Sequence, residues 1–121
     1  LSRNDESVNK RNEIASKYID AFKGKVKYQS SFDGARNAYH LFVIEVDNRK
    51  DLYDILREKG IFSQIHYIPV HKLPYYKEIG YQDADLSNSE TYYRRCISLP
   101  MYPTLSNEEQ DYVIENVIKN L

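Results

Sequence analysis

Apolar residues recur at the spacing of an amphipathic helix in three parts of the chain. The first series ends before Gly24, which lies where a helix C-cap glycine belongs. Its members are Ile14, Ala15, Tyr18, Ile19 and Phe22. The second series lies within residues 47–60, and its buried stripe comprises Leu52, Ile55 and Leu56. The third series closes the chain, with Val113, Ile114, Val117, Ile118 and Leu121 expected to face inward.

Polar residues predict where helices begin. Asp47 or Asn48 can cap the second helix, because a side-chain oxygen at the N-cap accepts a hydrogen bond from a free backbone N–H. The Ser-x-x-Glu spacing of a capping box occurs twice, as Ser87 with Glu90 and as Ser106 with Glu109. A fourth helix is therefore expected to start near residue 87, and the last one near residue 106.

Runs of β-branched and aromatic residues predict short strands between these helices. The clearest run is AYHLFVIEV, residues 38–46, whose nearly continuous apolar character is typical of a strand that is central or covered on both faces. Shorter candidates lie at residues 25–30, around 61–65 and in ISLPMYP. This order predicts an α+β fold, in which helices pack on a small antiparallel or mixed sheet.

Composition excludes several classes of protein. The 121 residues suit one domain, and 17 basic against 18 acidic residues give no basic face of the kind that binds nucleic acid. No apolar run approaches the roughly 20 residues that cross a bilayer, and the polar start LSRNDESVNKRNE shows no secretory signal. The single cysteine, Cys96, cannot form an internal disulfide, which fits a reducing compartment.

The familiar catalytic motifs are missing from the sequence. His66 and His71 lie five residues apart with Pro69 between them, and no cysteine or carboxylate stands near them at a metal-ligand spacing. The chain has no G-x-S-x-G nucleophile elbow and no glycine-rich phosphate loop. Cys96 is expected to be a small buried thiol. No self-contained catalytic apparatus is therefore predicted.

The segment IFSQIHYIPVHKLPYY, residues 61–76, concentrates two of the three histidines and two of the four prolines. Pro69 and Pro74 stiffen it, so that it can hold imidazole and phenol groups toward a polar ligand. Composition alone favours a simpler interpretation, in which His66 is a hydrogen-bonded core histidine and Pro69 ends a strand. The residues by themselves leave both interpretations open.

Several motifs together resemble the DegT/StrS family of sugar aminotransferases. They are RNEIASKYIDAF, NAYHLFVIEV, LREKGIFSQIHYIPVHKLPYY and SETYYRRCISLPMYPTLSNEEQDYVIENV, in that order along the chain. The resemblance implies the C-terminal small domain of a fold-type I aminotransferase, with a linking helix at residues 1–24 and the small domain at residues 25–121. It also implies that the large domain, which carries the Schiff-base lysine and binds pyridoxal phosphate, is absent from this chain.

The same resemblance implies a function for a longer enzyme. That enzyme would use pyridoxal phosphate to transfer the amino group of glutamate to C4 of a UDP-linked 4-keto-6-deoxy N-acetyl-hexosamine, as in the pseudaminic acid branch of the family. It would be a cytoplasmic homodimer. In this chain the resemblance implies substrate-binding roles for His66, Tyr67, His71 and Tyr76, and no catalytic, cofactor-binding or metal-binding residue. The competing hypothesis is a stand-alone module that binds a carbohydrate or a protein without catalysis.

Overall fold

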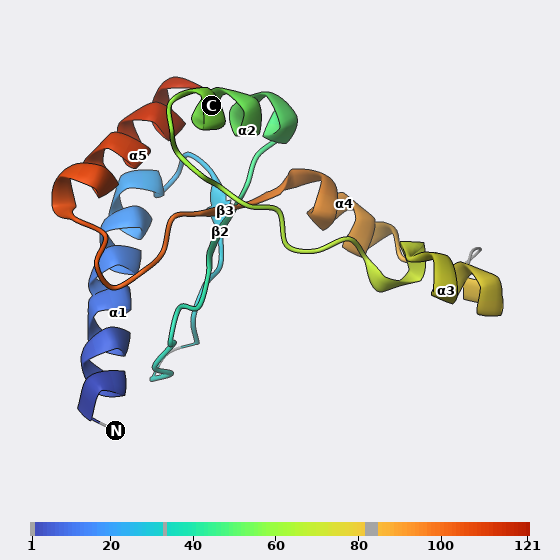
Figure 1. Ribbon diagram of the computed structural model, residues 1–121, viewed down its shortest axis with the longest axis horizontal. Helices are drawn as coiled ribbons and strands as arrows, with labels where there is room; N and C mark the ends of the chain where they lie inside the picture. The colour runs from blue at the N-terminus through green and yellow to red at the C-terminus, as the bar shows by residue number, and fades with distance from the viewer. Residues whose placement is uncertain (1, 33, 82–84) are drawn as a thin grey trace.

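The computed structural model of the chain describes residues 2–32, 34–81 and 85–121. Figure 1 shows a body in which three helices lie beside a small central sheet, and an arm that projects from it. We define the arm as residues 66–81 and 85–95, and the body as the other described residues.

The sheet has three short antiparallel strands in the order β1-β2-β3. They are β1 (Lys27–Tyr28), β2 (Phe42–Glu45) and β3 (Cys96–Leu99). Strand β2 is central, as its apolar run predicts, and the α+β fold with an antiparallel sheet is confirmed. The strands are shorter than the runs that predicted them. The strand expected around 61–65 is wrong, because only Gln64 pairs there, through a single bridge to Ser98.

Three helices of the body bury one face each. They are α1 (Ser2–Phe22), α2 (Arg49–Glu58) and α5 (Asn107–Lys119). The first ends as predicted, because Gly24 adopts a φ of 74°, a left-handed conformation that favours glycine at this position. These helices and the sheet share one hydrophobic core that runs from Ile14 in α1 to Val117 in α5.

Aromatic side chains occupy the centre of this core. The rings of Tyr18 and Phe42 lie 5.0 Å apart, and both side chains are fully buried. The Tyr18 hydroxyl donates a hydrogen bond to the carbonyl oxygen of Pro100 at 2.9 Å. Burial, with a smaller effect from the nearby Tyr102, raises the pKa of Tyr18 above its ordinary value, so this phenol stays protonated. Tyrosine thus supplies ring area to the core while its polar tip remains satisfied.

For two helices the sequence predicts more buried residues than the structure shows. In α2 only Leu52 and Leu56 are buried, while Ile55 is partly exposed. In α5 the inward prediction is wrong for Ile118, which is 37% exposed, and it is also wrong for Leu121, which lies beyond the end of the helix and is 45% exposed. Polar residues take part of the α5 interface instead: the buried Gln110 donates from its side-chain amide to the carbonyl oxygen of Ile14 at 2.7 Å.

Only one of the predicted side-chain caps forms. In α5 the backbone N–H of Glu109 donates to Ser106 Oγ at 3.1 Å, and the Ser106 N–H donates to Glu109 Oε2 at 2.9 Å, so that capping box is confirmed. Asn48 is the N-cap residue of α2 but makes no side-chain cap; its amide donates to the carbonyl oxygen of Asn120, and Asp47 pairs with Arg95.

The second predicted capping box, Ser87 with Glu90, is wrong. Helix α4 (Ser87–Arg95) has Leu86 at its N-cap position and no side-chain cap. The side chain of Asp85 accepts a hydrogen bond from the Ser87 N–H at 3.3 Å. The Glu90 carboxylate is engaged elsewhere, by side chains across the arm.

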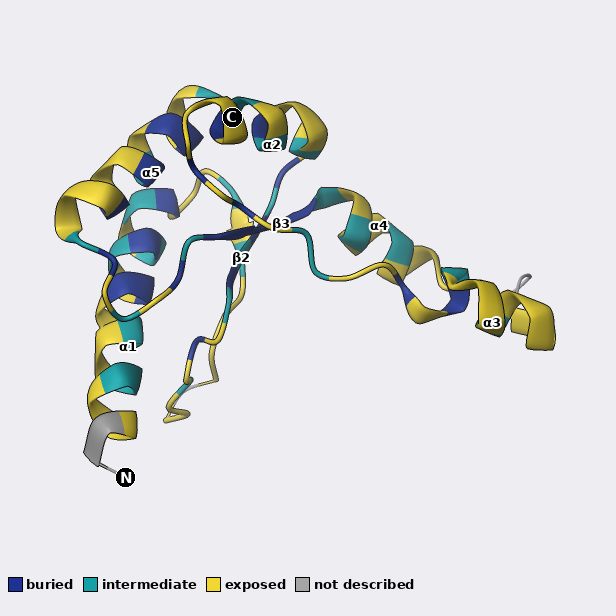
Figure 2. Ribbon diagram, in the orientation of Figure 1, coloured by how far each residue is buried: buried dark blue, intermediate teal, exposed yellow. Residues whose placement is uncertain are grey.

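The arm is built from short turns and one longer helix. It contains η1 (Val70–Lys72), α3 (Pro74–Tyr76) and η2 (Lys77–Tyr81), followed by α4. Figure 2 shows that most of the arm is exposed. Among its described residues only Pro69 and His71 are buried. Its exposed large apolar side chains are Tyr67, Ile68, Val70, Leu73, Tyr75, Ile79, Tyr81, Leu86 and Tyr92.

Candidate functional site at the arm

The root of the arm lies against β3. Gln64 and Ser98 exchange two backbone hydrogen bonds, of 3.0 and 2.8 Å, just before the chain enters the arm. Within β3, Ile97 and Leu99 belong to the hydrophobic core, so the alternating residues Cys96 and Ser98 point to the opposite face. All four residues of β3 are buried. The chain at the arm root therefore lies along the outer edge of β3, and the side chains of Cys96 and Ser98 lie on the face opposite Ile97 and Leu99.

His66 is held at this root by contacts from β3. Its Nδ1 lies 3.0 Å from the hydroxyl oxygen of Ser98. Its carbonyl oxygen lies 3.7 Å from Cys96 Sγ, whose single thiol hydrogen can be donated either to it or to the carbonyl oxygen of Tyr93 at the same distance. The side chain is half-buried. Among the described residues its Nε2 has no hydrogen-bond partner, and this atom is not one of the unpaired side-chain atoms that are buried. One ring nitrogen is thus anchored and the other is open to solvent.

Tyr67 follows directly and extends the exposed surface of His66. Its ring lies 4.6 Å from the His66 imidazole at an angle of 58°, and 73% of the residue is exposed. A phenol in this position offers both an aromatic face and a hydroxyl that donates and accepts. The structure therefore brings His66 and Tyr67 together as neighbouring polar and aromatic groups at the arm root.

His71 lies in a different environment, where it is 8% exposed and faces α4. Its Nε2 lies 3.0 Å from Oε1 of Glu90, while Lys72 Nζ lies 2.8 Å from Oε2 of the same carboxylate. We call these three side chains the Glu90 clasp. The hydrogen bond from Lys72, followed by that from His71, lowers the pKa of Glu90 to about 2, so the carboxylate is ionised at neutral pH.

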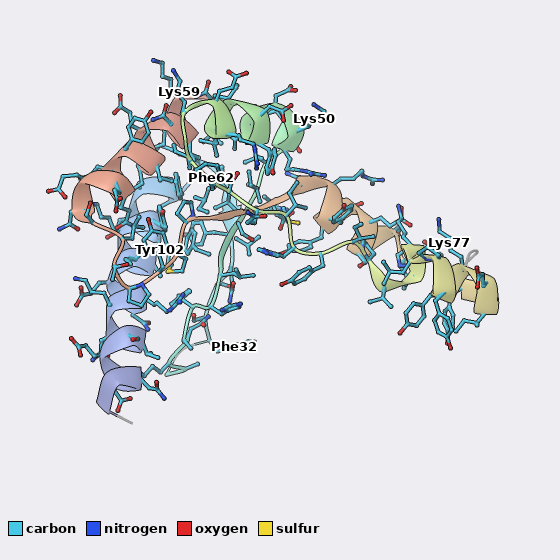
Figure 3. All side chains as sticks on the ribbon, viewed as in Figure 1. Phe32, Lys50, Lys59, Phe62, Lys77 and Tyr102 are labelled. Carbon is cyan, nitrogen blue, oxygen red and sulfur yellow. The ribbon has the colours of Figure 1, made fainter. Side chains whose placement is uncertain are left out.

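Tyr76 belongs to a third group, within α3 and η2. Its ring makes edge contacts with Tyr75 at 5.4 Å and with Tyr81 at 6.2 Å between centroids. Figure 3 shows the neighbouring Lys77 toward the far end of the arm. The four residues predicted to bind substrate are therefore distributed along the arm: His66 and Tyr67 at the root, His71 in the clasp and Tyr76 in a tyrosine cluster.

Two residues that hold this arrangement were missed by the sequence reasoning. Ser98 anchors His66, and its signal was the strict alternation of β3, which places a serine away from the core. Glu90 anchors His71 and Lys72, but its spacing from Ser87 indicated a capping box instead. In both cases the partner lies far along the chain, so local spacing carries no information about it.

The cavities of the body do not coincide with the predicted site residues. One of about 690 Å³ lies between residues 24–27 and 45–48, with Arg95 and Leu121 at its wall. Another, of about 230 Å³, is lined by Phe62 and Tyr102, which Figure 3 marks on the body. None of the four predicted residues lines either cavity. The arm presents an open surface, because most of its described residues are exposed.

The described residues do not fit a pyridoxal phosphate site by themselves. A Schiff-base lysine is activated by desolvation or by a neighbouring cation, yet no lysine in the described ranges is buried, and Lys72 is paired with Glu90. Burial raises the pKa of the Cys96 thiol, which disfavours the nucleophilic thiolate. Within the described part of the chain no three His, Cys, Asp or Glu side chains converge as a metal site would require. Among the same residues no helix is long and apolar enough to cross a membrane.

Comparison with known proteins gives relatives across almost the whole chain. The spore coat polysaccharide biosynthesis protein SpsC of Bacillus subtilis is 39% identical over 97% of this chain and 33% of its own length. The dTDP-3-amino-3,6-dideoxy-alpha-D-galactopyranose transaminase of Aneurinibacillus thermoaerophilus is 34% identical over 97% of this chain and 32% of its own length. The chain thus spans about a third of the length of these curated relatives.

Solved structures share the fold. A DegT DnrJ EryC1 StrS aminotransferase from Brucella abortus superimposes with a TM-score of 0.85 at 35% identity, over 93% of this chain and 31% of the other. Helicobacter pylori PseC, an aminotransferase involved in the biosynthesis of pseudoaminic acid, gives a TM-score of 0.84 at 26% identity, over 93% of this chain and 32% of the other. The family model matches residues 1–118, and the chain therefore belongs to the DegT/DnrJ/EryC1/StrS aminotransferase family.

Proposed function

We propose that this chain is the substrate-facing small domain of a pyridoxal-phosphate-dependent nucleotide-sugar aminotransferase. In this proposal residues 1–24 form the helix that links it to a large N-terminal domain, and residues 25–121 form the small domain itself. Family membership over residues 1–118 supports the proposal, and so does the share of about a third that the chain spans in its relatives. The observation that carries it is the open His66–Tyr67 pair on an arm that projects from the body.

The arm residues have chemistry that suits a nucleotide sugar. We expect His66 Nε2 and the Tyr67 hydroxyl to bind sugar hydroxyls or phosphate oxygens, because both groups are polar and solvent-facing in neighbouring positions. His71 lies behind them in the Glu90 clasp, and Tyr76 adds an aromatic ring toward the tip. In the complete enzyme this arm would close over the mouth of the active site.

The reaction itself is assigned to polypeptide outside this chain. Pyridoxal phosphate would act there as an electron sink for the transfer of an amine from glutamate to the keto carbon of the sugar. The present residues would bind and orient the sugar nucleotide, and none of them is proposed to move a proton. We further propose that the complete enzyme is a cytoplasmic homodimer.

For the substrate we propose a UDP-linked 4-keto-6-deoxy N-acetyl-hexosamine, with the amine delivered to C4. The likeness to Helicobacter pylori PseC supports this choice. The likeness to the Aneurinibacillus transaminase supports a different one, a dTDP-linked keto sugar that accepts its amine at C3. Turnover of the two purified keto sugars by the full-length enzyme separates them, since a strong preference for the dTDP sugar would overturn the first choice.

The role of the arm is tested by His66→Ala in the full-length enzyme. We expect a loss of about tenfold or more in kcat/KM for the nucleotide-sugar half-reaction, the size associated with one or two lost polar contacts, and little change in the glutamate half-reaction. His40→Ala is the matched control, because His40 is an exposed histidine in the body. Equal losses in both half-reactions would contradict a substrate-binding role.

The exposed aromatic residues of the arm also favour the alternative of a binding module without catalysis. A module of this kind would bind a carbohydrate or a protein by itself. Titration of the 121-residue chain with nucleotide sugars and with neutral oligosaccharides, followed by tyrosine fluorescence, tests it. Binding of oligosaccharide by the chain, together with a full-length protein that lacks transaminase activity, would replace the first proposal with this one.

A further inference from the structure

We propose that Ser98 is a positioning residue that fixes the tautomer and direction of His66, so that Nε2–H faces the ligand as a hydrogen-bond donor. This inference rests on the proposed function, because it names the atom by which the arm meets its substrate. The ligand group that Nε2–H would bind is an oxygen acceptor, such as a phosphate or a sugar hydroxyl oxygen.

The position of Ser98 is set by the sheet. Its backbone N–H and C=O both pair with Gln64, at 2.8 and 3.0 Å, and the residue is 3% exposed in β3. Its register partner in the central strand is Val43. These two backbone hydrogen bonds and the neighbouring strand β2 leave the Cα–Cβ direction of Ser98 little freedom. The hydroxyl is therefore carried by a fixed Cβ at the arm root.

The donors and acceptors of Ser98 and His66 indicate which imidazole nitrogen carries the proton. The Ser98 hydroxyl is buried, and His66 Nδ1, at 3.0 Å, is its hydrogen-bond partner among the described residues. If Nδ1 carried the proton, Ser98 Oγ would accept it, and the hydroxyl hydrogen would be left without an acceptor in a buried site, which costs free energy. Donation from Ser98 to Nδ1 satisfies both groups. The neutral imidazole then carries its proton on Nε2.

Two further contacts restrict the ring and its backbone. The imidazole packs against the Tyr67 ring at 4.6 Å, and the His66 carbonyl oxygen lies 3.7 Å from Cys96 Sγ, a thiol that also lies 3.7 Å from the Tyr93 carbonyl oxygen. Without Ser98 the ring can turn over about its terminal torsion, which exchanges the positions of the two nitrogens. The donor would then face the ligand for only part of the time, and binding would lose part of its preorganisation.

Ser63 offers a matched control for a merely structural serine. It is 1% exposed, and its hydroxyl has no hydrogen-bond partner in the described part of the chain. Replacing Ser63 by alanine removes a buried hydroxyl of the same size and leaves the hydrogen bond between Ser98 and His66 in place. Any effect that Ser98→Ala shows and Ser63→Ala lacks is therefore attributable to the contact with the imidazole.

The first experiment measures the His66 tautomer by long-range ¹H–¹⁵N NMR of the 121-residue chain at a pH where the ring is neutral. We expect the Nε2–H tautomer to predominate in the unmodified chain and in Ser63→Ala, and a mixture in Ser98→Ala. Ser98→Thr should restore the single tautomer, because it retains the hydroxyl. A predominant Nδ1–H tautomer in the unmodified chain would overturn the inference, and this measurement does not depend on any variant folding.

The second experiment uses the full-length enzyme. Ser98→Ala should raise KM for the nucleotide sugar about three- to tenfold, as expected for the loss of one oriented hydrogen bond, with the glutamate half-reaction unchanged and Ser98→Thr close to normal. An unchanged KM in Ser98→Ala would overturn the positioning role. If His66→Ala also leaves the sugar half-reaction unchanged while the NMR result holds, the proposed function fails and the Ser98–His66 hydrogen bond remains. The two failures are therefore distinguishable.

Discussion

The body and the arm are stabilised by different kinds of interaction. In the body, helices and sheet bury a shared core in which Phe42, Leu52 and Val117 are fully inaccessible to solvent. In the described part of the arm only Pro69 and His71 are buried, and the side-chain contacts across it converge on Glu90. The body can therefore rely on hydrophobic burial, whereas the conformation of the arm depends on a few polar contacts.

The two Ser-x-x-Glu patterns show that the same residue spacing forms different contacts in the body and in the arm. In α5 the pattern forms a capping box, with Glu109 bonded to its own helix start. In α4 the same spacing leaves Glu90 free to bond His71, which lies 19 positions away. A helix that packs on the core can use its glutamate for local capping, while the arm needs that carboxylate to join its two segments.

The largest expected effect is the loss of stability caused by opening a cavity in the body. Phe42→Ala should lower the free energy of unfolding by about 3–5 kcal/mol, because it removes a fully buried ring from the central strand. Tyr75→Ala removes an aromatic ring from the exposed arm and should change stability by about 0.5 kcal/mol or less. Urea denaturation of the 121-residue chain measures both. Comparable losses in the two variants would mean that the arm belongs to the same cooperative core.

A smaller effect is expected when the clasp is broken. His71→Ala should lower the local opening free energy of the arm, since it removes a partly buried hydrogen bond to the charged Glu90 carboxylate. Native-state hydrogen exchange should show faster exchange in residues 70–81 and 87–95 and unchanged exchange in β2. The control is His40→Ala. Uniformly faster exchange throughout the chain would show that the arm and the body do not open separately.

Acid should weaken the same clasp without removing its atoms. The pKa of Glu90 is lowered from an ordinary 4.5 to about 2 in the folded chain. Its contribution is therefore fully present above pH 4.5 and is lost as the pH falls toward 2, where the folded state also binds the proton. Tyrosine resonances of the arm, followed by NMR from pH 6 to pH 2, should shift in this window. In Glu90→Gln this part of the pH dependence should be absent, and its persistence there would assign the change to another group.

The smallest changes in stability are expected at the N-termini of α5 and α4. Ser106→Ala should destabilise the chain by about 1 kcal/mol, because it removes a side-chain cap that is present in the structure. Ser87→Ala should change stability by only a few tenths of a kcal/mol, because Ser87 makes no side-chain cap in α4. Thermal unfolding of both variants checks the difference. A loss of about 1 kcal/mol in Ser87→Ala would restore the capping box that the sequence indicates.

The sequence by itself determined the features that depend on neighbouring residues. Helical periodicity predicts α1, α2 and α5, and the residues 106–109 predict a cap that closes within one helical turn. The apolar run at 38–46 predicts the central strand, although only Phe42–Glu45 pair in the sheet. The concentration of histidine, proline and tyrosine at 61–76 indicates an unusual segment, and this segment lies within the residues that the family model matches.

Only the tertiary structure decided which partners the polar side chains of the arm have. Ser98 reaches His66 across 32 positions, and Glu90 reaches His71 across 19, whereas helix and cap rules extend over only three or four residues. The exposure of Ile118 was settled in the same way, because periodicity identifies a helix face but packing decides how much of that face is covered. The sequence therefore specifies the elements and the family, while the hydrogen bonds that orient the arm arise only when distant segments meet.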